Sequence, residues 1–101
     1  MLMIIKEKTV LDPNLEFVKV VIDIEKEILS AMCELHIDCY EELIKDGSKP
    51  KGLWGANVNL KTQTIAFVSM INIRPGKNDN MEIKDENVRT QVEAIIRKLI
   101  F

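Results

Sequence analysis

The sequence has few residues of the kinds from which catalytic and metal centres are commonly built. It contains one histidine and two cysteines in 101 residues, and the spacing of Cys33 and Cys39 lacks the paired pattern of a structural zinc site. Two cysteines are also too few for the disulfide framework of a small secreted domain. We therefore expect both cysteines to be reduced, and we expect no cofactor.

Long apolar runs and basic clusters are absent as well. No stretch approaches the roughly 20 apolar residues of a membrane span. The apolar start Met1–Ile5 is shorter than a signal-peptide core and is followed at once by charged residues. Lysines are mixed with acids, and the formal net charge is -2, so no surface is predicted to bind a run of phosphates. These absences predict a cytoplasmic protein that binds neither membranes nor nucleic acid.

The remaining composition is that of one compact globular domain covering residues 1–101. Hydrophobic residues make up 47% of the chain and charged residues 30%. Ile, Lys and Glu are abundant, and Gln63 and Gln91 are the two glutamines, a balance typical of thermophilic proteins.

Three stretches in the first half of the chain have the alternation of β-strands. Leu2–Lys6 is short and apolar; Phe17–Glu25 has its apolar residues at even numbers, while Lys19, Asp23 and Glu25 fall on the other face. Ile28–Ile37 has its apolar residues at odd numbers: Leu29, Ala31, Cys33, Leu35 and Ile37.

A hairpin would bring the two apolar sets to one face. This requires paired residue numbers that add to an odd sum, as a two-residue turn at Glu25-Lys26 or Lys26-Glu27 gives. Lys, Glu, Leu and Ala in this region also favour a helix, but the β-branched run Val20-Val21-Ile22 favours strands.

The second half predicts two helices around a second hairpin. Asp38-x-x-Glu41 has the form of a capping box that opens a helix of about two turns near 39–46, which Gly47 would end. Leu53–Leu60 and Ile65–Arg74 form the hairpin around the loop Lys61 to Thr64. Its apolar face would carry Trp54, Ala56, Val58, Leu60, Ile65, Phe67, Ile71 and Ile73.

The last predicted element is a helix over residues 86–100, capped by Asp85. Its period of 3.6 places Val88, Val92, Ile95, Ile96 and Leu99 in one stripe that must bury itself on the sheet. The sequence thus predicts an α+β fold with an antiparallel sheet of about five strands, an N-terminal strand plus two hairpins, with the C-terminal helix packed on one face.

The opposite face of the sheet is predicted to be solvated, as in many antiparallel sheets. The alternation places on it mainly polar residues: Ser30, Met32, Glu34, His36, Asp38, Asn57, Asn59, Asn72 and Arg74. Any binding site is therefore expected on this face.

Several blocks of the sequence resemble a family of small prokaryotic proteins that form a domain of unknown function. The blocks are Glu34-Leu35-His36-Ile37-Asp38, Asp46-Gly47-Ser48 with Leu53-Trp54-Gly55-Ala56-Asn57, and Ser69-Met70-Ile71-Asn72-Ile73-Arg74-Pro75, with Asp23-Ile24-Glu25-Lys26 before them. The resemblance runs from about residue 19 onward. It implies homology and supplies no activity or catalytic residues. This chain departs from the family in a shorter stretch before Phe17 and in Lys77-Asn78-Asp79-Asn80, which stands in place of a more basic loop.

The strongest candidate cluster is Glu34, His36 and Asp38, residue types that bind divalent metals or transfer protons. On a strand with about 3.3 Å of rise per residue, the outer two lie roughly 13 Å apart, too far for all three to bind one ion. A metal site of these residues is thus a weak alternative to a solvated sheet face. Asp38 also has a structural explanation as a helix cap.

A ligand site is predicted around Glu34, His36, Asn57, Asn72 and Arg74, where an arginine fork and amides could hold a carboxylate or phosphate. The plainer alternative for the arginine is an ion pair with a surface acid.

Other distinctive residues have structural explanations. Trp54 is expected in the core, and Gly55 lets another backbone or ring approach closely. Asp46-Gly47-Ser48 lacks the pattern of a phosphate-binding loop and is interpreted as a helix end. Cys33 would lie on the opposite face of its strand from His36, which argues against a catalytic pair.

These observations lead to two hypotheses. The first is a non-catalytic binding or assembly module that uses the polar sheet face or the sheet edge, with a second copy of the chain or another protein as its partner; Met32, Val68 and Met70 would add apolar contacts there. The second is a small-molecule or divalent-metal site, hydrolytic in one version, around Glu34, His36 and Arg74.

Overall fold

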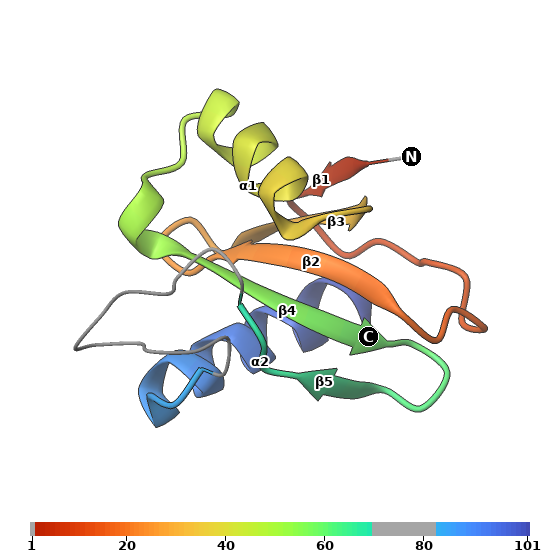
Figure 1. Ribbon diagram of the computed structural model, residues 1–101. Helices are drawn as coiled ribbons and strands as arrows, with labels where there is room; N and C mark the ends of the chain where they lie inside the picture. Colours follow the sequence, from red (N-terminus) through yellow and green to blue (C-terminus); the bar gives the residue numbers. More distant parts are fainter. Residues whose placement is uncertain (1, 70–82) are drawn as a thin grey trace.

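A computed structural model describes residues 2–69 and 83–101 of the chain (Figure 1). The described residues form five strands and two α-helices, which confirms the predicted α+β class. In chain order the elements are β1 (Met3–Ile5), β2 (Val18–Asp23), β3 (Ile28–Cys33), α1 (His36–Lys45), the 3-10 helix η1 (Pro50–Gly52), β4 (Leu53–Asn59), β5 (Thr64–Ala66) and α2 (Glu86–Ile100).

The strands form one antiparallel sheet in the order β1-β3-β2-β4-β5. Ile22 pairs with Leu29 and Asp23 with Ile28, so paired numbers add to an odd sum as predicted. The connection is a four-residue turn over 24–27. The second hairpin is also confirmed, with Val58 paired to Ile65. Its second strand, however, ends at Ala66, so the predicted continuation over residues 67–69 is wrong. The predicted continuation of its second strand through Ile71, Asn72, Ile73 and Arg74 lies outside the described residues.

Helix α2 packs on the predicted face of the sheet. It occupies the residues expected for it, and the Asp85 carboxylate caps it by accepting from the backbone N–H of Asn87 at 2.8 Å. The helix contacts β3 and β2, and its buried stripe belongs to the same larger core as the even-numbered residues of β2 and β4. This core contains Val18, Val20, Ile22, Leu29, Ala31, Ala56, Val58, Val92, Ile95, Ile96 and Leu99.

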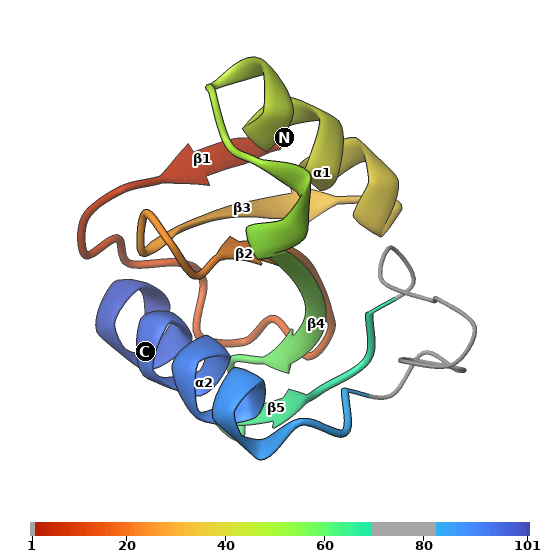
Figure 2. The same ribbon diagram turned by 90° about the vertical axis from the view of Figure 1, so that its left-hand side faces the viewer.

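The opposite face of the sheet is covered in part by α1, which corrects the expectation of a solvated face. Figure 2 shows the two helices on opposite sides of the sheet. Helix α1 packs against β3 and β2 over a second core of Val21, Ile28, Cys39, Leu43 and Leu53. Among the described residues, neither helix has the length and apolar character needed to cross a bilayer.

A bulge in β3 changes which side chains face α1. Val20 pairs with Ala31, but Lys19 pairs with Cys33, so Met32 is an extra residue, and its φ is 67°. Cys33 therefore lies on the α1 side, so the prediction that it shares the apolar face of Ala31 is wrong. For the same reason Met32 packs against the α2-side core, although it was expected on the solvated face.

The bulge is followed by the end of the strand. β3 ends at Cys33, so the predicted continuation to Ile37 is wrong, and α1 begins at His36, before the expected start near 39. The residue at the N-cap is Leu35, and Asp38 lies in the first turn without capping it. The end of the helix was predicted correctly, since Gly47 follows it with a φ of 100°.

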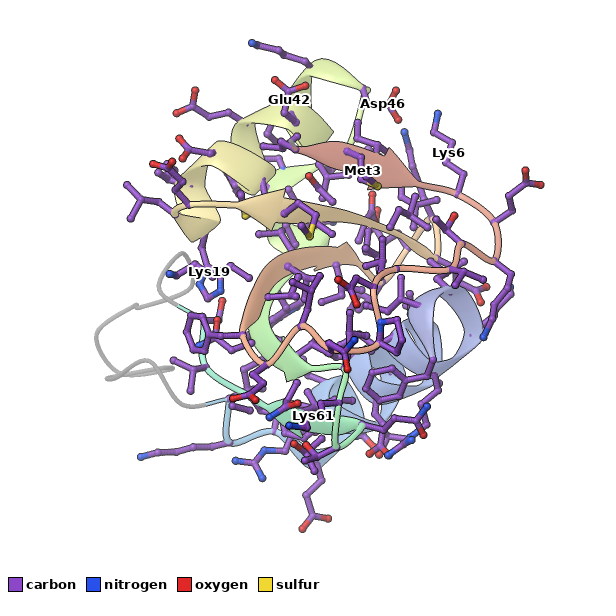
Figure 3. The ribbon with its side chains drawn as sticks, turned by 90° about the vertical axis from the view of Figure 1, so that its right-hand side faces the viewer. Met3, Lys6, Lys19, Glu42, Asp46 and Lys61 are labelled. Carbon is purple, nitrogen blue, oxygen red and sulfur yellow. A yellow bond between two sulfur atoms is a disulfide. The ribbon has the colours of Figure 1, made fainter. Side chains whose placement is uncertain are left out.

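Buried Asp23 and an ion pair connect the end of α1 to the sheet. The Asp23 carboxylate accepts from the backbone N–H of Glu25 at 2.9 Å and of Lys26 at 3.0 Å, and from Ser48 Oγ at 2.6 Å. Lys6 Nζ lies 3.1 Å from Asp46 Oδ2, and Figure 3 shows these two side chains together. Asp23 was expected on the solvated side of its strand, but it closes the β2–β3 turn.

Candidate functional site

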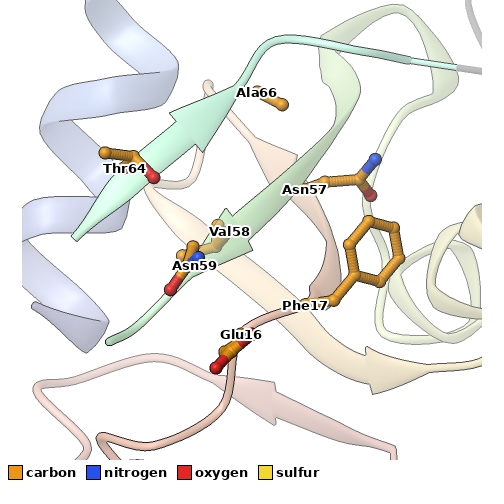
Figure 4. Close-up of a pocket in the computed structure, with 7 residues that line it drawn as sticks. All are labelled: Glu16, Phe17, Asn57, Val58, Asn59, Thr64 and Ala66. Carbon is orange, nitrogen blue, oxygen red and sulfur yellow. The ribbon is translucent and has the colours of Figure 1, made fainter. Parts of the chain in front are cut away.

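Helix α1 leaves one end of its sheet face uncovered. There Asn57 and Asn59 of β4 stand beside their partners Ala66 and Thr64 of β5. With Phe17 they surround an open hollow of about 120 Å³ (Figure 4). We call this depression the amide hollow; it is lined by Glu16, Phe17, Asn57, Val58, Asn59, Thr64 and Ala66.

His36 lies at the boundary between the covered and uncovered parts of this face. It is the first residue of α1 and is 4% exposed. Its Nε2 is 3.0 Å from the carbonyl oxygen of Ala56 and 3.2 Å from Oδ1 of Asn57. Because a carbonyl oxygen can only accept, Nε2 carries the hydrogen and donates it. The neutral ring then has its lone pair on Nδ1, which is buried and has no partner among the described residues.

The surroundings of His36 keep the ring neutral. Burial lowers its pKa from the ordinary 6.5, the hydrogen bonds to Ala56 and Asn57 oppose this effect, and the positive charge of Lys19 adds a smaller lowering. At neutral pH the imidazole is therefore an uncharged donor toward Asn57.

Gly55 allows the ring to lie this close to β4. A Cβ atom at this position would be 2.9 Å from His36 Nδ1 and 3.2 Å from its Cγ and Cε1. The prediction that this glycine admits a close neighbour is confirmed, and the neighbour is the His36 ring. The Gly55 N–H donates to Ser69 Oγ at 2.8 Å.

The hydrogen bond from His36 determines how Asn57 is oriented. Since Oδ1 accepts from Nε2–H, the Nδ2 amide group is left as a donor, and it has no partner in the described part of the chain. Asn59 is similar, because its Oδ1 accepts from Thr62 N–H at 3.1 Å. The hollow thus offers two amide donors from one face of β4.

An aromatic side chain and a positive charge lie beside these amides. Phe17 is 63% exposed, and Lys19 Nζ lies 4.9 Å from the centroid of its ring. The Glu16 carboxylate in the same lining pairs with Lys61 Nζ at 3.5 Å.

The structure brings two of the predicted ligand residues together. His36 and Asn57 are in hydrogen-bond contact, whereas Glu34 is exposed in the bend between β3 and α1. Asn72 and Arg74 lie outside the described residues.

The alternative metal set is not assembled. Glu34, His36 and Asp38 do not share a strand, and residues 2–69 and 83–101 contain no group of three or more His, Cys, Asp or Glu side chains that could hold a metal ion.

The cysteines form a disulfide between Cys33 and Cys39, which corrects the prediction that both are reduced. Their Cα atoms are 5.7 Å apart, within the usual range for this bond. With the strand continuing to Ile37, as predicted from the sequence, the Cα atoms of the two cysteines would have been too distant. Cys33 also shares the α1 side with His36, so the argument that separated them was wrong.

Phe17, like Glu16, Thr64 and Ala66, lines the hollow but was not predicted from the sequence as a site residue. Its odd number sets it apart from the even-numbered apolar residues of β2, so the alternation already placed an apolar side chain on the polar face. Trp54 was predicted correctly as a core residue, since it packs against the α2-side core.

Comparison with known proteins gives a family and no activity. The model of the family DUF5674, described as "Protein of unknown function", matches residues 4–99. No curated protein and no solved structure matches the chain.

Proposed function

The chain belongs to DUF5674, a family of proteins of unknown function, and from the geometry of the site we propose that it is a non-catalytic binding module whose contact surface is the amide hollow. The ligand class is a small molecule with a flat apolar or aromatic group next to a carboxylate or carbonyl oxygen. The observation that carries this proposal is the pair of asparagines in the lining whose oxygens already accept hydrogen bonds, beside an exposed phenylalanine.

The chemistry of the lining selects for such a ligand. The amide groups of Asn57 and Asn59 donate, and their Cα atoms are about 6.6 Å apart because they are two residues apart on a strand. Phe17 provides a ring face, and the Lys19 ammonium beside it favours a negative charge. A hydrogen bond contributes about 0.5–1.5 kcal/mol and an aromatic contact a similar amount, so we expect weak binding for a minimal ligand.

The role of His36 in this site is to orient Asn57. Its Nε2 is committed to Ala56 and Asn57, and its Nδ1 faces Gly55, so neither nitrogen is turned to the hollow. Both cysteine sulfurs are bonded to each other. These assignments favour binding over proton transfer or covalent chemistry.

The test is a titration of the ¹⁵N-labelled protein with N-acetyl-phenylalanine, which carries a ring, a carbonyl and a carboxylate. We expect shifts of the side-chain amide signals of Asn57 and Asn59 and of the backbone signal of Phe17. Phenethylamine, which has the ring and a positive charge but no acceptor, should bind more weakly.

Two variants make the test specific. Asn57→Ala should weaken binding about tenfold, which corresponds to one lost hydrogen bond of about 1.4 kcal/mol. The matched control is Asn87→Ala, an exposed asparagine at the start of α2 on the other side of the sheet, which should bind as the wild type does. Equal weakening by both variants, or shifts confined to residues away from the hollow, would refute the proposal.

Self-association is a second candidate that one observation favours. Phe17, Leu35 and Ile37 are large apolar side chains with exposed fractions of 63%, 58% and 43%. A second copy of the chain could cover them, as the assembly hypothesis from the sequence requires. Light scattering at micromolar concentration tests this candidate, and a strict monomer whose mass is unchanged by Phe17→Ser would exclude it.

A further inference from the structure

The two ends of α1 are held in different ways. At its C-terminal end the N–H groups of Asp46, Gly47 and Ser48 donate to carbonyl groups of the last turn, and Ser48 is hydrogen-bonded to buried Asp23. At its N-terminal end the cap residue Leu35 makes no side-chain capping bond, and it is largely exposed. The start of the helix therefore depends on other contacts.

Two contacts in the described structure hold this start to the sheet. One is the disulfide, which joins Cys33 at the end of β3 to fully buried Cys39 in α1. The other is the hydrogen bond from His36 to Ala56 and Asn57. His36 lies within the loop that the disulfide closes, so the covalent bond limits how far its ring can move from β4.

We propose that Cys33–Cys39 is a reversible thiol–disulfide site whose reduction releases the start of α1 and frees the His36 ring from Asn57. The consequence for ligand binding rests on the function proposed for the amide hollow. Without the donor from His36, the Asn57 amide can rotate and no longer presents a fixed Nδ2 group to a ligand.

The reductant is a dithiol, and the exchange balances without any other reactant. One thiolate of the dithiol attacks Sγ of Cys33, since this residue is half-buried whereas Cys39 is fully buried, and Cys39 Sγ leaves as a thiolate that takes up a proton. The second thiol then attacks the mixed disulfide and releases Cys33. The protein gains two electrons and two protons, and the dithiol is oxidised to a disulfide.

The surroundings of Cys33 suit the reduced state as well. Its Sγ lies 3.5 Å from the carbonyl oxygen of Lys19. A disulfide sulfur has no hydrogen, so this is a contact in the oxidised protein. After reduction the new S–H group can donate to the same oxygen.

A reversible disulfide agrees with the cytoplasmic location predicted from the sequence. In the cytosol disulfides are rare, and those that occur are usually transient and catalytic or redox-sensing. A cytoplasmic protein with this disulfide would therefore respond to the state of the thiol pool.

The single histidine makes the first test direct, because all imidazole signals in the NMR spectrum belong to His36. The oxidised protein and the protein reduced with dithiothreitol are compared, with free thiols counted by mass spectrometry after alkylation. We expect the Nε2–H signal to be lost or shifted on reduction and the pKa of His36 to rise toward 6.5, while the signals of α2 stay in place.

The variant Cys33→Ser/Cys39→Ser should show the reduced spectrum and should not respond to dithiothreitol. If it fails to fold, the comparison of oxidised and reduced wild type still decides. The proposal is overturned if the wild type forms no disulfide under mild oxidation, or if complete reduction leaves the His36 signals unchanged.

Titration of both forms with N-acetyl-phenylalanine separates this proposal from the proposed function. Binding that is about tenfold weaker in the reduced form, as for Asn57→Ala, supports both. Equal binding to the two forms, with unmoved His36 signals, refutes the switch and keeps the binding function. If the His36 signals shift on reduction but neither form binds N-acetyl-phenylalanine, the binding function is refuted and the switch is kept.

Discussion

Replacement of Gly55 by alanine tests the close contact between Gly55 and the His36 ring. We expect this change to destabilise the protein, whereas Gly→Ala in a strand ordinarily stabilises it. In a strand, Gly→Ala stabilises by about 0.5–1 kcal/mol, since glycine loses more freedom on folding. Here the added Cβ would be 2.9 Å from His36 Nδ1. This is well inside the contact distance of about 3.5–4.0 Å, so either the ring or α1 has to move.

The loss of stability in Gly55→Ala can be estimated from the overpacking and from the displacement of the His36 ring. Overpacking in a filled interior costs about 1–3 kcal/mol. Displacement of the ring also weakens the hydrogen bond from Nε2 to Ala56, which is 3.0 Å long in the wild type and is worth about 1 kcal/mol. After the gain from removing a glycine, we expect Gly55→Ala to destabilise the protein by about 2 kcal/mol.

Urea unfolding followed by the fluorescence of the single tryptophan, Trp54, measures this effect. The midpoint should fall by about 1 M, given a typical slope of roughly 1–3 kcal/mol/M. Gly52→Ala is the matched control, because its Cβ would meet the movable side chain of Glu25 at 3.2 Å. It should be close to neutral.

A double-mutant cycle with His36→Ala identifies the ring as the cause. In the absence of the ring, Gly55→Ala should regain its ordinary stabilising effect of about 0.5–1 kcal/mol, giving a coupling energy of about 2.5–3 kcal/mol. Unchanged or increased stability of Gly55→Ala in the wild-type background would refute the contact. An undiminished loss in the His36→Ala background would refute the ring as its cause.

Three further predictions concern the anchors around the sheet. Ser48→Ala removes the hydrogen bond to the buried carboxylate of Asp23 in β2 and should cost about 1.5–3 kcal/mol in thermal unfolding. Ser30→Ala, which removes a buried hydroxyl that has no partner among the described residues, should be nearly neutral. Asp85→Ala should lower the free energy of unfolding by about 0.5–2 kcal/mol, because it removes the α2 cap. An equal loss of stability in Asp38→Ala would contradict the finding that Asp38 does not cap α1. Because burial lowers the pKa of His36 below 6.5, acidification protonates this histidine in the unfolded chain first, so the His36 contribution to stability is full above pH 6.5 and declines as the pH falls toward the lower pKa of the folded state. Urea midpoints measured above and below pH 6.5 should show this decline in the wild type. A His36→Gln variant whose urea midpoint falls equally with pH would disprove the prediction.

The stretch from Glu34 to Asp38 shows where prediction from the sequence failed. Its residues alternate as in a strand, but in the folded protein they lie in a bend and the first turn of α1. His36, Cys39 and Leu43 are the buried residues of that helix, with the i, i+3, i+7 spacing of a helical stripe. Counting the histidine as a polar surface residue hid this signal.

For the amide hollow, the sequence predicted the face of the sheet but not which part of that face stays open. Asn57 was predicted as a ligand residue from its place on the polar face, and this face was identified correctly for β4. Which part of the face stays open depends on where α1 ends its coverage. That depends in turn on the bulge at Met32, which moves Cys33 to the α1 side and allows the disulfide.

The sequence by itself determined the elements that repeat a local pattern: the odd sum of paired residue numbers in the hairpins, the α2 stripe with its Asp85 cap, and the close approach permitted by Gly55. These follow from side-chain period, capping and glycine geometry, which act over a few neighbouring residues. Only the tertiary structure decided the bulge, the early start of α1, the disulfide and the joining of His36 to Asn57. One extra residue in a strand inverts the alternation after it, and it is selected by the packing of segments distant in the chain.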